Sequence, residues 1–268
     1  MNEQPDKQMS ELKEEKEKAD KTSKAMMHFI ASMNHEIRTP VNGIIGITQL
    51  LKASDNLSQE QLAFAKIIEN AAFGILNSWE ENTDFLSLTS GWTEVFITET
   101  KLTGFLGQLH FRFMYECEIK AIRLNLKNSL NSPERIIMTD SILLAKVFTL
   151  LINNAIKYAS QGTVEFGVSP GCEPSHNPDE LEFYVKDSGP GIPEPIRERI
   201  RACFNQTDPG FSGPCFMAGM SMSLAKVFID MLNGKIRMES EDGKGAAFYF
   251  TIPVNGKPDE DQHKNNKT

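Results

Sequence analysis

One histidine and its neighbours supply the side chains of this chain that are best suited to chemistry. Glu36 follows His35 directly, and Arg38, Thr39 and Asn42 stand three, four and seven residues further on. On a helix, which turns about 100° per residue, these three side chains share the face of His35. An exposed imidazole is partly neutral at neutral pH and is a good nucleophile, and an adjacent carboxylate can fix its tautomer or take its proton.

The apolar residues around His35 predict that its side chain points to solvent. They recur every three or four positions and form a stripe suited to burial against partner helices. The stripe consists of Met26, Phe29, Met33, Ile37, Val41 and Ile44. His35 lies two residues from Met33 and two from Ile37, which places it about 200° away from each around the helix.

An exposed His beside a Glu is in most proteins only part of a solvated helix surface. The string from Phe29 to Pro40 favours a function, because it resembles the phosphoacceptor box of sensor histidine kinases of the HisKA type, H-E-[IL]-R-T-P. The resemblance implies that His35 is phosphorylated and that Glu36 orients and deprotonates its imidazole. It also implies that Thr39 could place a water for the reverse, phosphatase step.

Three further strings resemble the ATP-binding domain of histidine kinases, the Bergerat or GHKL fold. The first, Asn153-Asn154-Ala155-Ile156-Lys157-Tyr158, resembles its N box. By that resemblance, the cofactors are ATP and Mg²⁺, Asn154 is the metal ligand, and Asn153, Lys157 and Tyr158 line the nucleotide. An amide oxygen suits a hard cation such as Mg²⁺. A surface helix face of Asn and Lys is the alternative for so short a string.

The second string, Asp187-Ser188-Gly189-Pro190-Gly191-Ile192, resembles the G1 box, D-x-G-x-G-I, and follows a predicted strand. The resemblance implies that Asp187 accepts a hydrogen bond from the adenine amino group and that Gly189, Gly191 and Ile192 approach the base. Alone, this string also fits a turn. Gly243-Lys244-Gly245-Ala246 resembles the last glycine motif of the same domain.

Several positions depart from the family pattern, all on the phosphate side. Leu150 stands where the family has a second Asn, and Arg201 where the F box has a Phe. In the string 218–224, Gly219 and Leu224 match the G2 box, but Ser221 and Ser223 replace glycines. Their Cβ atoms could block the approach of backbone N–H groups to phosphates or the φ and ψ angles needed there. The predicted lid, 207–217, has no Lys or Arg. Reversing Leu150, Ser221 and Ser223 together is expected to raise the kinase rate.

Length and composition fit a two-domain chain with a sizeable core. It has 268 residues, 40% of them hydrophobic, and a net charge of −8, which argues against a nucleic-acid partner. Its four cysteines show no CxxC pairing, which predicts reduced thiols and no zinc site. No uninterrupted apolar run approaches 18 residues, so no membrane span is predicted.

The first 90 residues are predicted to be helical. Residues 1–23 are charge-dense and predict a helical linker, the end of a coiled coil or a frayed tail. A helix is expected over about 23–51, with Pro40 as a kink and hinge, and a second helix follows a polar turn ending near Ser58. Its stripe is Leu62, Ala65, Ile68, Ala72, Ile75 and Trp79. Since a hairpin cannot bury both stripes alone, residues 24–90 predict a homodimeric antiparallel four-helix bundle.

Residues 92–254 predict an α/β sandwich, with helices layered on a mixed sheet. Helices are expected over about 102–113, 141–159 and 223–232. Strands are expected at 122–126, 164–168, 181–185, 235–238 and 248–252. Residues 255–268 predict a disordered tail or linker.

The resemblance spans residues 24–254 and implies a dimeric sensor histidine kinase core. Such a protein autophosphorylates on His35 with ATP, passes the phosphoryl group to an Asp of a response-regulator receiver domain, and takes its signal from an upstream sensor domain. It is expected to be the cytoplasmic portion of a parent anchored in the inner membrane. The alternative is a degenerate kinase: a phosphatase-biased or nucleotide-poor dimeric phosphotransfer module. A GHKL ATPase without a phosphoacceptor does not account for the H box.

Overall fold

The chain divides into two compact units, Met1–Thr93 and Glu94–Thr268. The computed structural model describes residues 32–54, 57–89, 93–129, 135–159, 162–169, 179–206 and 218–255. The predicted linker 1–23, the lid 207–217 and the tail beyond Asn255 lie outside the described residues.

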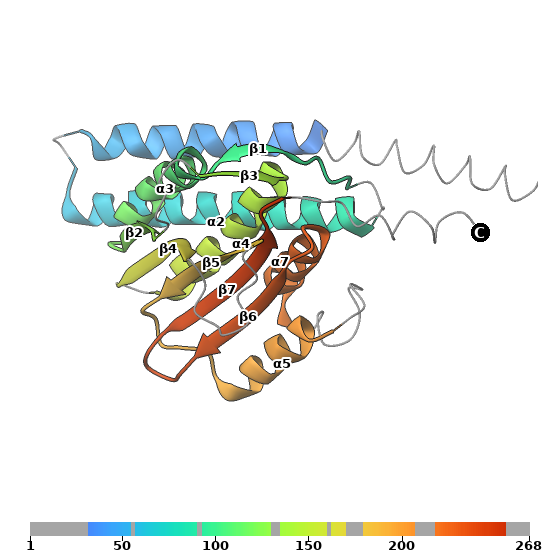
Figure 1. Ribbon diagram of the computed structural model, residues 1–268. Helices are drawn as coiled ribbons and strands as arrows, with labels where there is room; N and C mark the ends of the chain where they lie inside the picture. Colours follow the sequence, from blue (N-terminus) through green and yellow to red (C-terminus); the bar gives the residue numbers. More distant parts are fainter. Residues whose placement is uncertain are drawn as a thin grey trace, which may run out of the picture. The chain divides into compact units, whose positions relative to one another are not determined.

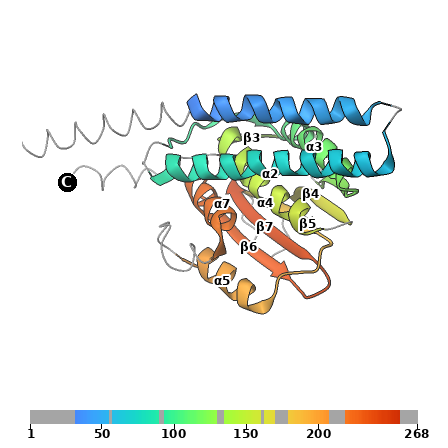
Figure 2. The same ribbon diagram turned by 180° about the vertical axis from the view of Figure 1, so that it is seen from behind.

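The first unit contains a hairpin of two long helices (Figures 1 and 2). The first helix is described over residues 32–52 and continues through Pro40; the second, α2, spans Gln59–Thr89. A reciprocal cap starts α2, because the backbone N–H of Gln61 donates to Ser58 Oγ at 3.2 Å and that of Ser58 donates to Gln61 Oε1 at 2.8 Å. The predicted helical hairpin is therefore present.

The core of the hairpin differs from the two predicted stripes at several positions. Val41, Ile45 and Ala72 are buried, with Ile37, Phe73 and Leu76 packed around them. Ile44, expected inside, is 42% exposed, and Ile45 takes its place. The predicted interior residues Ile68 and Ile75 of α2 are about half exposed in the single chain.

The second unit is built on a five-stranded mixed sheet in the order β2-β4-β5-β7-β6. These strands are β2 (Arg123–Asn128), β4 (Thr163–Ser169), β5 (Glu180–Asp187), β7 (Ala246–Pro253) and β6 (Lys235–Ser240). Only the β2–β4 pair is parallel among the described strands of this sheet. The five strands were all predicted, although each is longer or shifted by a few residues.

A second, two-stranded sheet joins β1 (Thr98–Lys101) antiparallel to β3 (Ile136–Thr139), and the sequence did not predict it. Met138 of β3 also bridges to Asn255, and its N–H donates to Val254 O at 2.8 Å. Both β1 and the last described residue therefore attach to β3. Asn255, placed by the sequence in a tail, belongs to the fold.

Helices α3 (Leu102–Ile119), α4 (Ser141–Tyr158) and α7 (Met220–Met231) cover one face of the five-stranded sheet (Figures 1 and 2). The core centres on Phe148 of α4, whose ring lies edge-on to Phe166, Phe183 and Phe250 of three strands. The predicted sandwich is confirmed. Helix α5 (Glu194–Phe204) was not predicted.

Two expectations from the sequence, on membrane spans and on the cysteines, can be compared with the structure. Within the described residues, α4 alone is long and apolar enough to cross a membrane by length and composition, and 56% of it is buried inside the unit, as expected of a core helix. Cys117 is free and buried, but Cys203 is disulfide-bonded, so the prediction of reduced thiols is wrong for Cys203.

Candidate active site

His35 is exposed on the first helix, as its position opposite the apolar stripe predicted. The hydroxyl of Thr39, one turn later, donates to the main-chain oxygen of His35 at 2.9 Å. Ser32 Oγ lies 3.3 Å from Glu36 Oε1, one turn earlier on the same helix. The imidazole is thus open to a reaction partner, while the side chains beside it are held by local contacts.

Side chains of α2 fix the rotation of the first helix next to His35. The indole N–H of Trp79 donates to Asn34 Oδ1, and Thr83 Oγ1 lies 3.0 Å from the same oxygen. Arg38 Nη2 forms an ion pair with Glu80 Oε1 at 2.9 Å. The sequence assigned Trp79 to the apolar stripe and gave no signal for Asn34, because such contacts depend on how the two helices face each other.

The N box lies in the last turn and a half of α4. Asp140 caps this helix by accepting from the N–H groups of Ile142 and Leu143, and its Oδ2 accepts from Phe96 N at 2.8 Å. A polar residue before an apolar helix is a start signal that could have predicted the cap. Asp140 thereby ties the segment entering the unit to the helix that carries the N box.

Two amide oxygens of the N box are suited to a ligand. Asn154 Nδ2 donates to Leu150 O at 3.0 Å, which turns its Oδ1 away as an acceptor. Asn153 Oδ1 is buried and has no hydrogen-bond partner among the described residues. Lys157 and Tyr158 are exposed at the end of the helix, with the Lys157 ammonium 5.2 Å from the Tyr158 ring centroid.

These amides fit a Mg²⁺ ion carried by a nucleotide better than a resident metal. Mg²⁺ takes oxygen ligands and is often bound by few protein groups together with phosphates and water. Within the described residues, no group of three or more His, Cys, Asp and Glu side chains could hold a metal. The donor set of Asn153 and Asn154 is therefore compatible with Mg²⁺ held jointly with phosphates.

The G1 box begins at the end of β5 and folds back beside the N box. Gly189 N donates to Asp187 Oδ1 at 2.8 Å. A Cβ atom on Gly189 would lie 2.7 Å from Tyr158 O, so only glycine permits this approach. Burial raises the pKa of the Asp187 carboxyl, against the opposing effect of hydrogen bonds from the backbone of Gly189 and Ala246. The structure therefore brings the predicted Asp187, Gly189 and Tyr158 together.

The G2 departures do not strain the backbone. Gly219 has φ of +99°, and α7 begins directly after it. Ser221 and Ser223 lie within the first turns of α7, and neither has a positive φ. Ser223 Oγ donates to Gly219 O at 3.0 Å. The predicted conflict with glycine-only backbone angles is thus absent at both serines.

Two residues on the phosphate side face the core. Leu224, a predicted nucleotide contact, has no exposed surface, so it supports the site from behind. Leu150 is 3% exposed and packs inside the unit, where the family pattern has an amide. Arg201 of the F box is exposed and pairs with Glu194 at 3.1 Å.

Comparisons with known proteins match both units. Residues 25–75 match the model of the His Kinase A (phospho-acceptor) domain. Residues 139–256 match the model described as histidine kinase-, DNA gyrase B-, and HSP90-like ATPase. The first match covers the first helix and the start of α2, and the second covers α4 to β7, including four strands of the mixed sheet.

Relatives align along nearly the whole chain. The aerobic respiration control sensor protein ArcB of Escherichia coli (strain K12) is 29% identical over 91% of this chain and 31% of its own length. The autoinducer 2 sensor kinase/phosphatase LuxQ of Vibrio vulnificus (strain YJ016) is 31% identical over 88% of this chain and 27% of its own length. The chain thus spans less than a third of these two relatives.

One solved structure agrees in fold with a TM-score of 0.55 and 25% identity, full-length ShkA in complex with AMPPNP. The match covers 86% of this chain and 46% of ShkA. The two domain matches, the relatives and the shared fold lead to one conclusion. The chain belongs to the sensor histidine kinases, of which it carries the phosphoacceptor and ATP-binding domains.

Proposed function

We propose that this chain uses ATP to phosphorylate its own His35 and then donates the phosphoryl group to an aspartate of a receiver domain. The observation that carries the proposal is the pairing, in one chain, of an exposed H-box histidine with a half-buried G1 aspartate beside the N box. A solvated helix surface would require neither the family sequence around His35 nor a nucleotide domain.

The residues of the chain contribute positioning and proton transfer. A ring nitrogen of His35 attacks the γ-phosphorus, the bond from that phosphorus to the leaving oxygen of ADP breaks, and the ring proton passes to Glu36. Asp187 accepts from the adenine amino group, while Lys157 and Tyr158 border the nucleotide at the end of α4. Mg²⁺, held by Asn154 and the phosphates, would neutralise the charge on the transferring group.

The test uses radiolabelled nucleotide and a matched variant. The chain incubated with γ-labelled ATP and Mg²⁺ should acquire label that is stable to base and labile to acid, and His35→Gln should remove it. His28→Gln, which changes a histidine outside the H box, is the control and should keep it. Label that persists in His35→Gln would contradict the assignment of His35.

The exposed apolar side chains of the hairpin support a homodimer. In a single chain, Ile47 is 61%, Leu50 75%, Phe64 56% and Ile67 63% exposed. Large apolar side chains exposed on neighbouring turns of a helix are typical of an interaction site. A second copy is the proposed occupant, because two hairpins complete a four-helix bundle that buries these residues.

The partners and location proposed for the whole protein follow from the family. A receiver domain, separate or fused C-terminally, would accept the phosphoryl group, and a sensor domain would act upstream. The chain would form the cytoplasmic portion of a parent anchored in the inner membrane. The net charge of −8 supports a protein partner rather than nucleic acid.

One observation favours the alternative, a phosphotransfer module with weak nucleotide binding. Leu150 fills core space where the family pattern supplies an amide, so the phosphate side has one oxygen ligand fewer. In that case a phosphorylated receiver would still load His35, because this step needs no nucleotide. Titration of Mg²⁺ with ADP, by calorimetry, distinguishes the two functions.

A further inference from the structure

The adenine loop, residues 187–192, interlocks with the turn between β6 and β7, residues 241–245. Gly243 N donates to Pro190 O at 2.7 Å across the two segments. A Cβ atom on Gly191 would lie 2.3 Å from Glu241 O, and the φ of Gly191 is +78°. The two backbones touch without intervening side chains, so the position of the turn determines the position of the loop.

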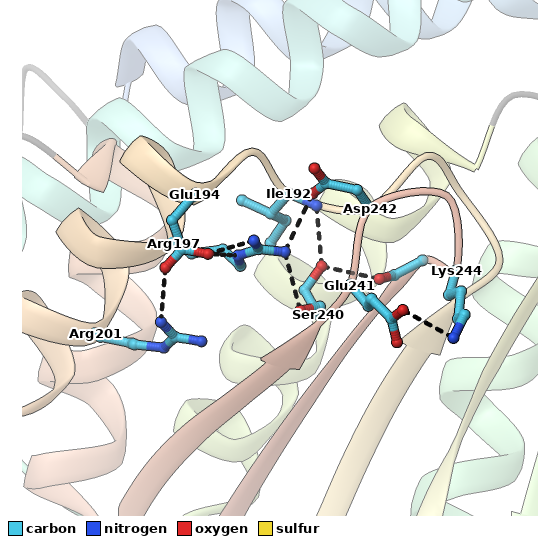
Figure 3. A network of polar contacts seen from close by, with 9 residues as sticks. Ile192, Glu194, Arg197, Arg201, Ser240, Glu241, Asp242 and Lys244 are labelled. Atoms are coloured by element: carbon cyan, nitrogen blue, oxygen red, sulfur yellow. Dashed lines mark hydrogen bonds and ion pairs between the residues drawn. The ribbon is translucent and has the colours of Figure 1, made fainter.

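Ser240 joins the loop to both ends of this turn. Its Oγ accepts from Ile192 N at 2.9 Å and donates to Gly245 O at 2.9 Å (Figure 3). Gly245 in turn abuts the loop, since a Cβ there would lie 2.0 Å from Asp187 O. The far end of the adenine loop thus depends on where the Ser240 backbone lies.

Arg197 of α5 holds that backbone from outside the loop. Its Nη1 lies 3.1 Å from both Ser240 O and Asp242 Oδ1, and its Nε donates to Glu194 Oε2 at 2.7 Å (Figure 3). The Arg197 side chain is only 12% exposed, whereas that of Asp242 is 76% exposed. The hydrogen bond from Arg197 is also the largest cause that lowers the pKa of Glu194. A planar guanidinium suits this role, because its donors reach three groups in fixed directions.

We propose that Arg197 is a positioning residue for the nucleotide: it fixes the β6–β7 turn, and through Ser240 the adenine loop, in the arrangement that Asp187 needs to bind adenine. The role rests on the proposed function of the second unit. The turn has exposed residues on both sides of Gly243 and two glycines with positive φ, so it has little order of its own. Within the described part of the chain, the side-chain hydrogen bonds and ion pairs of Arg197 reach Glu194, Ser240 and Asp242, and none reaches Asp187.

The expected effect on the apparent Kd for nucleotide follows from the fraction of molecules whose adenine loop is competent to bind. If the loop is competent for only a tenth of the time once Arg197 is removed, the apparent Kd for nucleotide rises about tenfold. Because the loop does not touch the reacting atoms, the KM for ATP should rise by the same factor while kcat changes little.

The experiment compares Arg197→Met, Arg197→Lys and Arg199→Met in the full chain. Arg199, on the same helix, is exposed, and its side chain makes no hydrogen bond or ion pair within the described part of the chain. Amide exchange at Ile192 and Gly243 is measured without nucleotide, and Kd is measured with ADP. Arg197→Met should speed both exchange rates and raise Kd about tenfold. Arg197→Lys, with a single donor group, should recover part of the loss, and Arg199→Met should match the parent.

Each other outcome has a defined meaning. Unchanged exchange and Kd in folded Arg197→Met overturn the proposal. If that variant does not fold, Ser240→Ala, which removes the acceptor for Ile192 N, replaces it, and an unchanged Kd again overturns the proposal. If the parent chain binds no ADP, the proposed function fails, while the exchange rates still decide the role of Arg197. Loading of His35 from a phosphorylated receiver should be unaffected; its loss would show a general structural defect and overturn the proposal.

Discussion

Restoring the family amide at position 150 is expected to destabilise the second unit. Leu150 is 3% exposed in α4, so Leu150→Asn removes a buried apolar side chain and buries an amide in its place. The lost apolar burial costs about 1.5–3 kcal/mol, and an amide without a partner costs about 1–3 kcal/mol more. The expected total of about 2.5–6 kcal/mol revises the expectation that this change helps to raise the kinase rate.

The measurement is the Tm of the full chain by differential scanning calorimetry, with and without Mg²⁺ and ADP. For a unit of this size, 1 kcal/mol corresponds to about 2–4 °C, so Leu150→Asn should lower Tm by about 10 °C. Leu150→Met keeps the volume and is the control, expected to cost less than about 1.5 kcal/mol.

The result that would refute this reasoning is specific. If Leu150→Asn keeps the Tm of the parent and binds Mg²⁺ with ADP more tightly, then position 150 opens toward the phosphates. Leu150 would in that case be a functional loss rather than a core residue, and the degenerate alternative would gain support.

Four further outcomes are expected. Burial raises the pKa of Asp187, so the affinity for ADP should be full above that raised pKa and should fall as the pH drops through it. Asp187→Asn should abolish ADP binding. Calorimetric titration over a pH series checks this, and a Kd that does not change with pH would contradict it. Because the pKa of the Asp187 carboxyl is raised in the folded state, the folded state binds a proton there more readily than the unfolded state does. The contribution of Asp187 to the free energy of unfolding of the nucleotide-free unit should therefore decrease as pH rises through the raised pKa. Ser223→Gly should lower the free energy of unfolding by about 1 kcal/mol, because glycine weakens α7 and removes the hydrogen bond to Gly219 O. The autophosphorylation rate should not rise; a faster rate would show that the serine obstructs phosphate binding. The double variant Ile47→Glu and Ile67→Glu should be a monomer in light scattering. The control, Gln49→Glu at another exposed position, should remain dimeric. A dimer in the double variant would place the interface elsewhere.

The elements that the sequence predicted share a strong local pattern. Helix α4 combines a cap residue with a long apolar stripe, and β5 concentrates the apolar residues Leu181, Phe183, Tyr184 and Val185 in five positions. Helix α5 was missed because it is rich in charge and buries only Ile200, Cys203 and Phe204. The four-residue strands β1 and β3 were missed because their alternation is too short to stand out from a turn.

The sequence predicted those site residues that belong to recognisable motifs. It did not predict which residues are buried by the packing of helices and strands. The exposure of His35 followed from helix periodicity, and the G1 and N boxes came together as their resemblance implied. The burial of Leu150 and Leu224 did not follow, because a family motif does not state which face of a helix meets the core. Likewise, the contacts of Arg197 join segments more than forty residues apart, and no local pattern reports them.

The attachment of β1 and of the last described residue, Asn255, to the same strand β3 has a mechanical consequence. β1 pairs with β3 from one side, and Asn255 bridges to Met138 of the same strand. Tension applied between these two attachment points would load the short β1–β3 ladder and the bridge at Met138 before the longer ladders of the five-stranded sheet that carries the adenine loop. Under a pulling force, this ladder is where the first rupture should occur, with the nucleotide site still intact beyond it.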